Sequence, residues 1–250
     1  VDTHCHLYFK ELEDYLPGVL ERANELGVSR FICVGTNLED SRRSLELAEH
    51  YDSIYATAGI HPHDAKDAKE GYLQELETLL SHQKMVACGE MGLDFFRNIS
   101  EPATQKKVFR EQLDLAEKLK KPVIFHNRNA DEDIIKILSK KMDIKGVSHC
   151  FSSNLETANI FITLGFYISF SGNLTFKNST LPKVAEHLPL DKLLVETDSP
   201  FLSPMPHRGK ANEPGRVRFV AEKLAEIKGV QLETVVSHTT QNAKDLFGLD

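Results

Sequence analysis

The chain has 250 residues, of which 41% are hydrophobic and 27% are charged, and these proportions are those of an ordinary globular protein. A formal net charge of −7 argues against a protein whose main task is to coat nucleic acid, because such proteins use an excess of Lys and Arg to release counterions from phosphates. No stretch has the apolar length of a membrane span, and no basic and then apolar leader precedes the first strand-like run. We therefore expect a cytoplasmic protein without membrane association.

The four cysteines have no Cys-x-x-Cys spacing, and each lies in a short apolar run that is typical of a strand. They are Cys5, Cys33, Cys88 and Cys150. We interpret them as small core residues in a reducing compartment, since disulfides belong mainly to oxidising ones.

Strand-like and helix-like patterns alternate from one end of the chain to the other. Short apolar runs typical of buried strands occupy residues 1–6, 30–35, 54–60, 85–90, 122–126, 146–149, 166–170 and 192–198. Amphipathic helical patterns occupy residues 15–26, a second stretch capped by Asn37 or Asp40, and then 72–82, 102–120, 131–141, 154–164 and 181–187. Two further helices, 215–228 and 232–247, are expected to cover the outside.

This strict alternation predicts parallel strands covered by helices, because parallel neighbours need a crossover connection and bury both faces of the sheet. Eight such units with no linker between them favour a single closed (β/α)8 barrel, a TIM barrel, over residues 1–250. A doubly wound open sheet is the competing architecture, but it normally carries a glycine-rich phosphate loop after its first strand. Here that position holds His4-Cys5-His6-Leu7.

The first strand-like run carries two histidines with one residue between them. Side chains alternate faces on a strand, so His4 and His6 would point the same way and could hold one cation together. A His-x-His pair also occurs by accident or at a surface, so the pair alone does not establish a metal site. The ligands that the rest of the chain adds decide between these interpretations.

Residues that can bind metals stand at the ends of six of the predicted strands. In chain order they are His4 and His6, His61 and His63, Glu90, His126, His149 and Asp198. The carboxyl ends of the strands of a parallel barrel meet at one mouth, and buried imidazoles and carboxylates there must be paired or coordinated. We therefore predict a metal centre at this mouth rather than a set of independent core histidines.

The number of donors indicates more than one ion. Four imidazoles and two carboxylates exceed the ligands of one tetrahedral cation and suit two divalent metal ions that share a bridging carboxylate. Glu90 is the natural bridge, because the glycines around it let the backbone turn close to the metals. One ion would be held by His4, His6, Glu90 and Asp198, and the other by Glu90, His126 and His149. Asp94 could support these ligands from a second layer.

Seven short motifs identify a resemblance that covers nearly the whole chain. They are THCHL at 3–7, GIHPH at 59–63, GEMGLD at 89–94, HNR at 126–128, HCFS at 149–152, ETDSPFL at 196–202 and GKANEP at 209–214. Together they resemble those of the TatD-family metal-dependent deoxyribonucleases of the amidohydrolase superfamily. Relatives often carry an acidic residue in place of Asn129 and Gly in place of Ser153. Neither position is a metal ligand, so these departures concern substrate fit.

The chain is also similar to the wider amidohydrolases, such as dihydroorotase and phosphotriesterase. Their dinuclear members usually bridge the two ions with a carboxylated lysine. Glu90 stands at the corresponding position here, which favours the TatD branch.

The family resemblance implies exonucleolytic hydrolysis of single-stranded DNA or RNA from the 3′ end, through a metal-bound hydroxide at a dinuclear centre. The residues by themselves indicate only metal-assisted hydrolysis. Asp198 could take the proton of the attacking water, and Glu90 would bridge the cations that activate it. His61 could orient a phosphoryl oxygen or assist the leaving alkoxide with His63 beside it, although either histidine could be only structural.

Two arginines are candidate substrate contacts. Arg128, just past the fifth strand, could bind a phosphate, and Arg208 lies in the cationic loop 207–210 after the eighth strand. A solvated arginine and a loop that merely packs over the barrel mouth are the alternatives. The histidines in or at the ends of helices are interpreted as solvated side chains without function; they are His50, His82, His187 and His238.

Ligand type leaves the metal open, because imidazoles favour Zn2+ or Mn2+ whereas the family resemblance implies Mg2+. The substrate is open too. A small-molecule amidohydrolase or lactonase, or an esterase acting on acylated tRNA, could use the same centre, and a metal-binding scaffold without turnover is the non-enzymatic alternative. The expected partner is a single-stranded nucleic acid as substrate, with no obligate protein partner evident.

Overall fold

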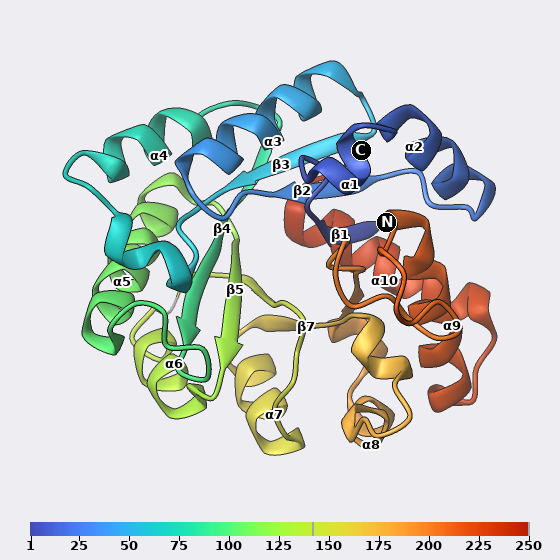
Figure 1. Cartoon of the computed structure of the whole chain (residues 1–250). Helices are drawn as coiled ribbons and strands as arrows, with labels where there is room; N and C mark the ends of the chain where they lie inside the picture. The colour runs from blue at the N-terminus through green and yellow to red at the C-terminus, as the bar shows by residue number, and fades with distance from the viewer. Residues whose placement is uncertain (142, 250) are drawn as a thin grey trace.

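The computed structural model describes residues 1–141 and 143–249, in which strands and helices alternate along the chain (Figure 1). The strands are β1 (Asp2–Cys5), β2 (Phe31–Val34), β3 (Ile54–Ala58), β4 (Met85–Asp94), β5 (Val123–Arg128), β6 (Gly146–Ser148), β7 (Phe166–Phe170) and β8 (Leu193–Val195). The α-helices are α1 (Lys10–Glu13), α2 (Leu16–Glu25), α3 (Leu38–His50), α4 (Tyr72–Leu80), α5 (Pro102–Leu119), α6 (Asp131–Leu138), α7 (Leu155–Thr163), α8 (Leu181–His187), α9 (Val217–Lys228) and α10 (Leu232–Phe247). The short 3-10 helices are η1 (Pro62–Asp67), η2 (Gly172–Thr175), η3 (Leu190–Lys192) and η4 (Pro214–Arg216).

The eight strands form one sheet in the order β1 to β8, and each strand lies parallel to its neighbours in the sequence. The first and last strands meet at a seam, where Cys5 forms a parallel bridge with Ser199. The backbone N–H of Asp198 donates to the carbonyl of His4 at 2.9 Å, and that of His6 donates to the carbonyl of Ser199 at 2.8 Å. The sheet is therefore a nearly closed (β/α)8 barrel, and the predicted fold is confirmed.

Several strands have other bounds than expected. Most end earlier, because the chain leaves the extended conformation at the barrel mouth, where Cys150 has a φ of 42° and Asp198 a φ of 58°. By contrast, β4 continues past the expected 85–90 and reaches Asp94, since residues 91–94 pair with residues 125–128 of β5. Cys150 lies in a turn after β6 and is only half-buried, so the strand position expected for it is wrong.

The predicted helices agree with the observed ones to within two residues at each end, except that α6 ends at Leu138 instead of residue 141. Helix α3 begins after Asn37, whose side-chain oxygen accepts from the N–H of Asp40 at 2.9 Å, so Asn37 is its N-cap. The four-residue α1 and the 3-10 helices were not expected. None of the described helices combines the length and the apolar character that a bilayer span requires.

Gly92 of β4 is required by a close approach between strands. Its φ is +135°, and a Cβ there would lie 2.1 Å from the carbonyl oxygen of His126. No larger side chain fits this position. The contact brings β4 against β5 at the level where both strands carry residues of the mouth.

The amino end of the barrel is closed by α10. One buried apolar cluster joins strand residues to the last turns of this helix; it includes Ile32, Val34, Ile124, Val147, Leu194, Ala243, Leu246 and Phe247. Asn242 of α10 donates to the carbonyls of Leu190 and Leu193 at 2.8 Å each, which fixes the helix beside the start of β8. The mouth therefore lies at the other, carboxyl end of the strands.

Helix α5 holds two loops of the mouth in place through buried glutamines. The Gln112 side chain accepts from the N–H of Ile60 at 2.7 Å and donates to the carbonyl of the same residue at 3.0 Å. The Gln105 side chain accepts from the N–H of Asp94 at 2.8 Å. Because Ile60 directly precedes His61, both contacts position side chains that belong to the candidate site.

Candidate metal centre

His4 and His6 meet a carboxylate from β4 and another from the chain that follows β8. The Nε2 atoms of the two histidines lie 3.3 Å apart, and both side chains are buried. Glu90 Oε2 lies 3.4 Å from His4 Nε2. Asp198 Oδ1 lies 3.7 Å from Nε2 of His4 and 3.4 Å from Nε2 of His6. These four residues form the first half of the centre.

The spacing of these donor atoms fits one cation. Ligands about 2.1 Å from an ion lie about 3.0 to 3.4 Å from one another in octahedral or tetrahedral arrangements. The observed separations, from 3.3 to 3.7 Å, are close to those values. The first half therefore brings together the side chains expected to hold the first ion.

The other oxygen of Glu90 faces a second group of imidazoles. Glu90 Oε1 lies 2.8 Å from His149 Nε2, 3.3 Å from His61 Nε2 and 3.3 Å from His126 Nδ1. Nδ1 of His126 and Nε2 of His149 are 3.4 Å apart. Glu90 thus turns one oxygen to each half, as a bridging ligand would. His61, which was expected to act on substrate, also lies within reach of an ion in this second half.

The centre gathers more negative charge than the protein neutralises. Four carboxylates contact its imidazoles; they are Glu90, Asp94, Glu196 and Asp198. Within residues 1–141 and 143–249, none of them forms an ion pair with Lys or Arg. Burial opposes ionisation of Glu90, but His149 and His61 outweigh it and hold its pKa well below the ordinary value. Buried carboxylates that no Lys or Arg neutralises favour a metal cation in their midst.

The imidazoles differ in their protonation. Burial lowers the pKa of His61 to about 4, and it also lowers the pKa of His4. Burial acts in the same direction on His149, but Glu90 and Glu196 raise the pKa of that imidazole well above its ordinary value. At neutral pH, His4 and His61 are therefore in the neutral form that binds metals, whereas a metal must displace a proton from His149.

Glu196 and the Val34 carbonyl orient two of the imidazoles. Glu196 Oε1 lies 3.2 Å from Nδ1 of His149, and the Val34 carbonyl lies 2.9 Å from Nδ1 of His6. Each contact turns the Nε2 atom of its histidine towards the centre. The sequence analysis gave Glu196 no role; its only signal was a carboxylate in an apolar strand, two residues before Asp198.

Asp94 contacts the second half from the side, as expected of a supporting residue. Its Oδ2 lies 2.9 Å from Nε2 of His63 and 3.2 Å from Nε2 of His126. Its Oδ1 accepts from the backbone N–H groups of Phe96 and Arg97 at 3.0 and 2.7 Å. His63 is therefore turned towards Asp94, beside the centre.

Asp2 ties the first strand to the segment that carries Asp198. The Asp2 carboxylate accepts from the N–H of Thr197 at 2.8 Å and from its hydroxyl at 2.6 Å. Burial raises the pKa of Asp2 to about 7. The sequence did not predict a role for this residue. Asp2 lies two residues before His4 on β1, and its contacts hold the first and last strands of the sheet together.

The two candidate arginines lie on the rim and stack on aromatic rings. The guanidinium carbon of Arg128 is 4.8 Å from the ring centre of Phe96, and that of Arg208 is 3.8 Å from the ring centre of Phe176. The structure thus brings together His61 and the six expected metal ligands, whereas both arginines lie outside this group, on the rim.

Asn129 and Ser153, the two departures from the family pattern, line one hollow of about 490 Å3.

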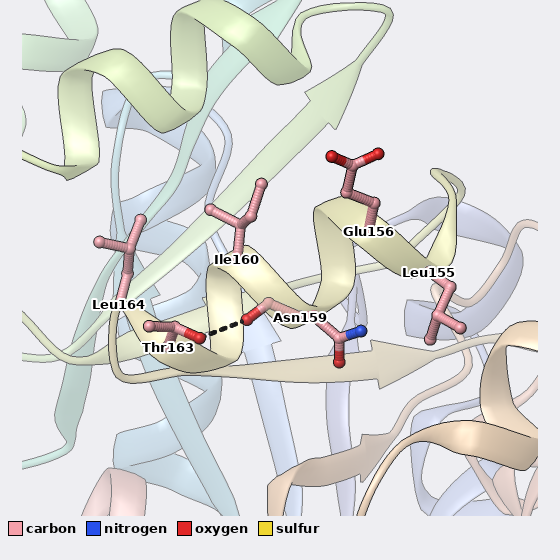
Figure 2. Close-up of a pocket in the computed structure, with 6 residues that line it drawn as sticks. All are labelled: Leu155, Glu156, Asn159, Ile160, Thr163 and Leu164. Carbon is pink, nitrogen blue, oxygen red and sulfur yellow. Dashed lines mark hydrogen bonds between the residues drawn. The ribbon is translucent and has the colours of Figure 1, made fainter.

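A separate hollow lies on the outer face of α7 (Figure 2). It is lined by Leu155, Glu156, Asn159, Ile160, Thr163 and Leu164. The Thr163 hydroxyl donates to the Asn159 carbonyl at 2.8 Å, within the helix itself. This hollow contains no imidazole, and none of the expected site residues lines it, so it does not belong to the candidate centre.

Comparison with known proteins agrees with this geometry. "Uncharacterized metal-dependent hydrolase YabD" of Bacillus subtilis is 44% identical over 252 residues, which cover 100% of this chain and 99% of that protein. "3'-5' ssDNA/RNA exonuclease TatD" of Edwardsiella piscicida is 37% identical, and the match covers 100% of this chain and 99% of that protein. The solved structure of YJJV, a TatD homolog from Escherichia coli K12, is 32% identical with a TM-score of 0.95, and the match covers 100% of this chain and 98% of that one.

A family model described as "TatD related DNase" matches residues 1–248. The match spans all the residues of the candidate centre, from His4 to Asp198. The chain therefore belongs to the TatD-related DNase family of metal-dependent hydrolases.

Proposed function

We propose that this protein hydrolyses phosphodiester bonds of single-stranded DNA or RNA from the 3′ end, with two divalent metal ions held on either side of Glu90. One observation carries the proposal: the two oxygens of Glu90 face two separate groups of imidazoles. The relative from Edwardsiella piscicida, named as an exonuclease of single-stranded DNA and RNA, supports the choice of substrate.

The residues of the first half would supply a proton acceptor. Cations bound at this centre would neutralise the charge of a phosphodiester and lower the pKa of an attacking water. The Asp198 side chain is 16% exposed, more than that of Glu90 at 4%, and it is therefore the carboxylate that a water at the mouth can reach. Since His6 and His4 lower the pKa of Asp198 against the effect of burial, it is ionised and can accept the water's proton.

His61 would act on the substrate by hydrogen bonding rather than by charge. With a pKa lowered to about 4 by burial, it is neutral at pH 7. Its side chain is 11% exposed and directs Nε2 towards Glu90, close to the position of a reacting phosphoryl group. A neutral imidazole there can orient a phosphoryl oxygen, or it can ligate an ion of the second half.

Ligand chemistry supports Mg2+ or Mn2+ as the working metal, with Zn2+ as an alternative. The two carboxylates Glu90 and Asp198 suit Mg2+, while the imidazoles suit Mn2+ and Zn2+.

The expected cytoplasmic location stays a prediction. It is supported by the four cysteines, all of which are free thiols.

The test is hydrolysis of a single strand labelled at its 5′ end, with and without chelator, across a series of metals. We expect products that shorten stepwise from the 3′ end, and no products in chelator. Glu90→Gln protein purified in parallel controls for contaminating nucleases. Turnover of lactones, cyclic amides or acylated tRNA without turnover of any strand would instead support one of the alternative hydrolases.

A further inference from the structure

The most exposed apolar side chains gather around the mouth of the barrel. Among the described residues, those that follow the carboxyl ends of strands are Tyr15, Phe96, Ile99, Phe201 and Met205, and only two, Val230 and Val236, lie elsewhere. Large apolar groups exposed together on a protein mark surfaces that bind something. Two of them, Phe96 and Phe201, lie next to residues of the candidate centre, which indicates that they contact its substrate.

One aromatic surface lies beside the second half of the centre. Phe96 is 59% exposed, and the Arg128 guanidinium lies over one face of its ring, 4.8 Å from the ring centre. The N–H of Phe96 donates to Asp94, whose other oxygen contacts His126. The backbone that carries the ring is thus held next to Asp94, which contacts a candidate metal ligand. We call Phe96 and Arg128 the first platform.

A second aromatic surface lies beside the first half. Phe201 is 48% exposed, and its ring meets that of Phe9 edge to face at 5.3 Å. Both rings lie about 6 Å from the imidazole of His6, at 6.1 and 5.8 Å. The N–H of Phe201 donates to the carbonyl of Asp198 at 2.8 Å, so the backbone that carries this ring is held next to the centre. We call Phe201 and Phe9 the second platform.

The two platforms follow strands on opposite sides of the barrel. Phe96 follows β4 and Phe201 follows β8, and these strands are four places apart in a ring of eight. Glu90 turns one oxygen to His4 in the first half and the other to His126 in the second half, so it lies between the two platforms. A chain molecule bound across Glu90 would contact one platform on each side of the bond that is cleaved.

We propose that the two platforms stack unpaired nucleobases on either side of the scissile phosphodiester. This inference rests on the proposed function and adds what is recognised, namely the open faces of bases. Aromatic rings and guanidinium planes stack on any base, which gives affinity without sequence preference. The faces of paired bases are covered by their neighbours in a duplex, so the platforms select single strands. The net charge of −7 agrees, since stacking does not require an excess of cations.

The test uses metal-loaded protein and a phosphorothioate strand, which resists hydrolysis, with 2-aminopurine near its 3′ end. Stacking quenches 2-aminopurine fluorescence, so both the quench and the affinity can be measured. We expect Phe96→Ala and Phe201→Ala each to weaken binding about 5- to 150-fold and to reduce the quench. Phe201→Trp should restore both. Val236→Ala, which removes an exposed apolar side chain outside the mouth, is the matched control and should change neither.

An abasic strand of the same length separates stacking from backbone contacts. Both alanine variants should lower the preference of the protein for the base-bearing strand over the abasic one. Unchanged affinity in both variants, or an equal loss for the two strands, would overturn the platforms while leaving the proposed function intact if wild-type protein still cleaves single strands. If wild-type protein neither binds nor cleaves any strand, the proposed function fails and the platforms fail with it.

Discussion

The two ends of the barrel satisfy their polar groups in opposite ways. At the amino end, polar side chains pair with the backbone: the Lys84 ammonium donates to the carbonyls of Asp52 and Ile54, and Lys121 donates to that of Met85. At the carboxyl end, buried carboxylates contact imidazoles that we propose as metal ligands. These polar groups of the amino end therefore find partners within the protein, whereas we propose that those of the carboxyl end are completed by cations.

This difference separates stability from function in one barrel. The apolar cluster that includes Phe247 and Ile32 excludes water at the amino end and contributes to the free energy of unfolding. The carboxylates Glu90 and Asp198 at the mouth belong instead to the proposed metal centre, so their loss should reduce metal binding and turnover. Substitutions at the two ends should therefore change different quantities, and this can be measured.

The largest effect is expected for Glu90→Gln. A neutral amide cannot bridge two cations, so kcat should fall about a thousand-fold or more. The backbone of β4 is held by its pairing with β5, so the fold should persist, with an unchanged circular dichroism spectrum. Glu186→Gln, at an exposed position of α8, is the matched control. Full activity in Glu90→Gln would refute the bridging role.

A comparable free energy should be lost at the amino end with Phe247→Ala, but as stability. Phe247 is 5% exposed within the cluster at the base of the barrel, and removing such a ring costs about 3 to 5 kcal/mol. Chemical denaturation should show this loss, while kcat per folded molecule and metal affinity stay unchanged. Phe247→Leu should lose less. A parallel fall in metal affinity would show that the two ends are coupled.

An intermediate effect is expected for Glu196→Gln. This change weakens the contact that orients the candidate ligand His149, but it leaves His149 itself in place. The charge of Glu196 holds the Nδ1 proton of His149, at 3.2 Å. Replacing such a partner typically costs 10- to 100-fold in metal affinity or activity. Isothermal titration with Mn2+ should show the loss. The same affinity as wild type would show that the charge of Glu196 does not support His149 as a ligand.

The sequence predicted which candidate ligands meet at the mouth because two local rules were sufficient for them. Alternation along a strand placed His4 beside His6, and parallel strands in a barrel brought Glu90 and His149 to the same end. Glu196 and Gln112 obey no such rule. Their partners His149 and Ile60 are 47 and 52 residues away in the chain, so their roles depend on which elements become neighbours.

The bounds of β4 escaped prediction for a related reason. Its extension to Asp94 depends on pairing with β5 and on the close approach of Gly92 to the His126 carbonyl, which is a contact between strands. The contacts of the rim could not be predicted for the same reason. Arg128 was expected to contact phosphate, but the sequence could not show that it stacks on Phe96. Spacing therefore predicted which residues reach the mouth, while their partners there required the structure.

The smallest effect is expected for Lys84→Met at the amino end. Its ammonium donates to two carbonyls and lies 5.1 Å from the ring centre of Tyr55, while methionine keeps much of the apolar stem. Losing these contacts at a partly exposed site should cost about 0.5 to 1.5 kcal/mol of stability. The midpoint of urea unfolding should fall slightly in both metal-loaded and chelated protein. Because the proposed cation sites lie at the far end, we expect the same shift in the two states if the ends are independent. A shift that depends on metal would contradict that independence.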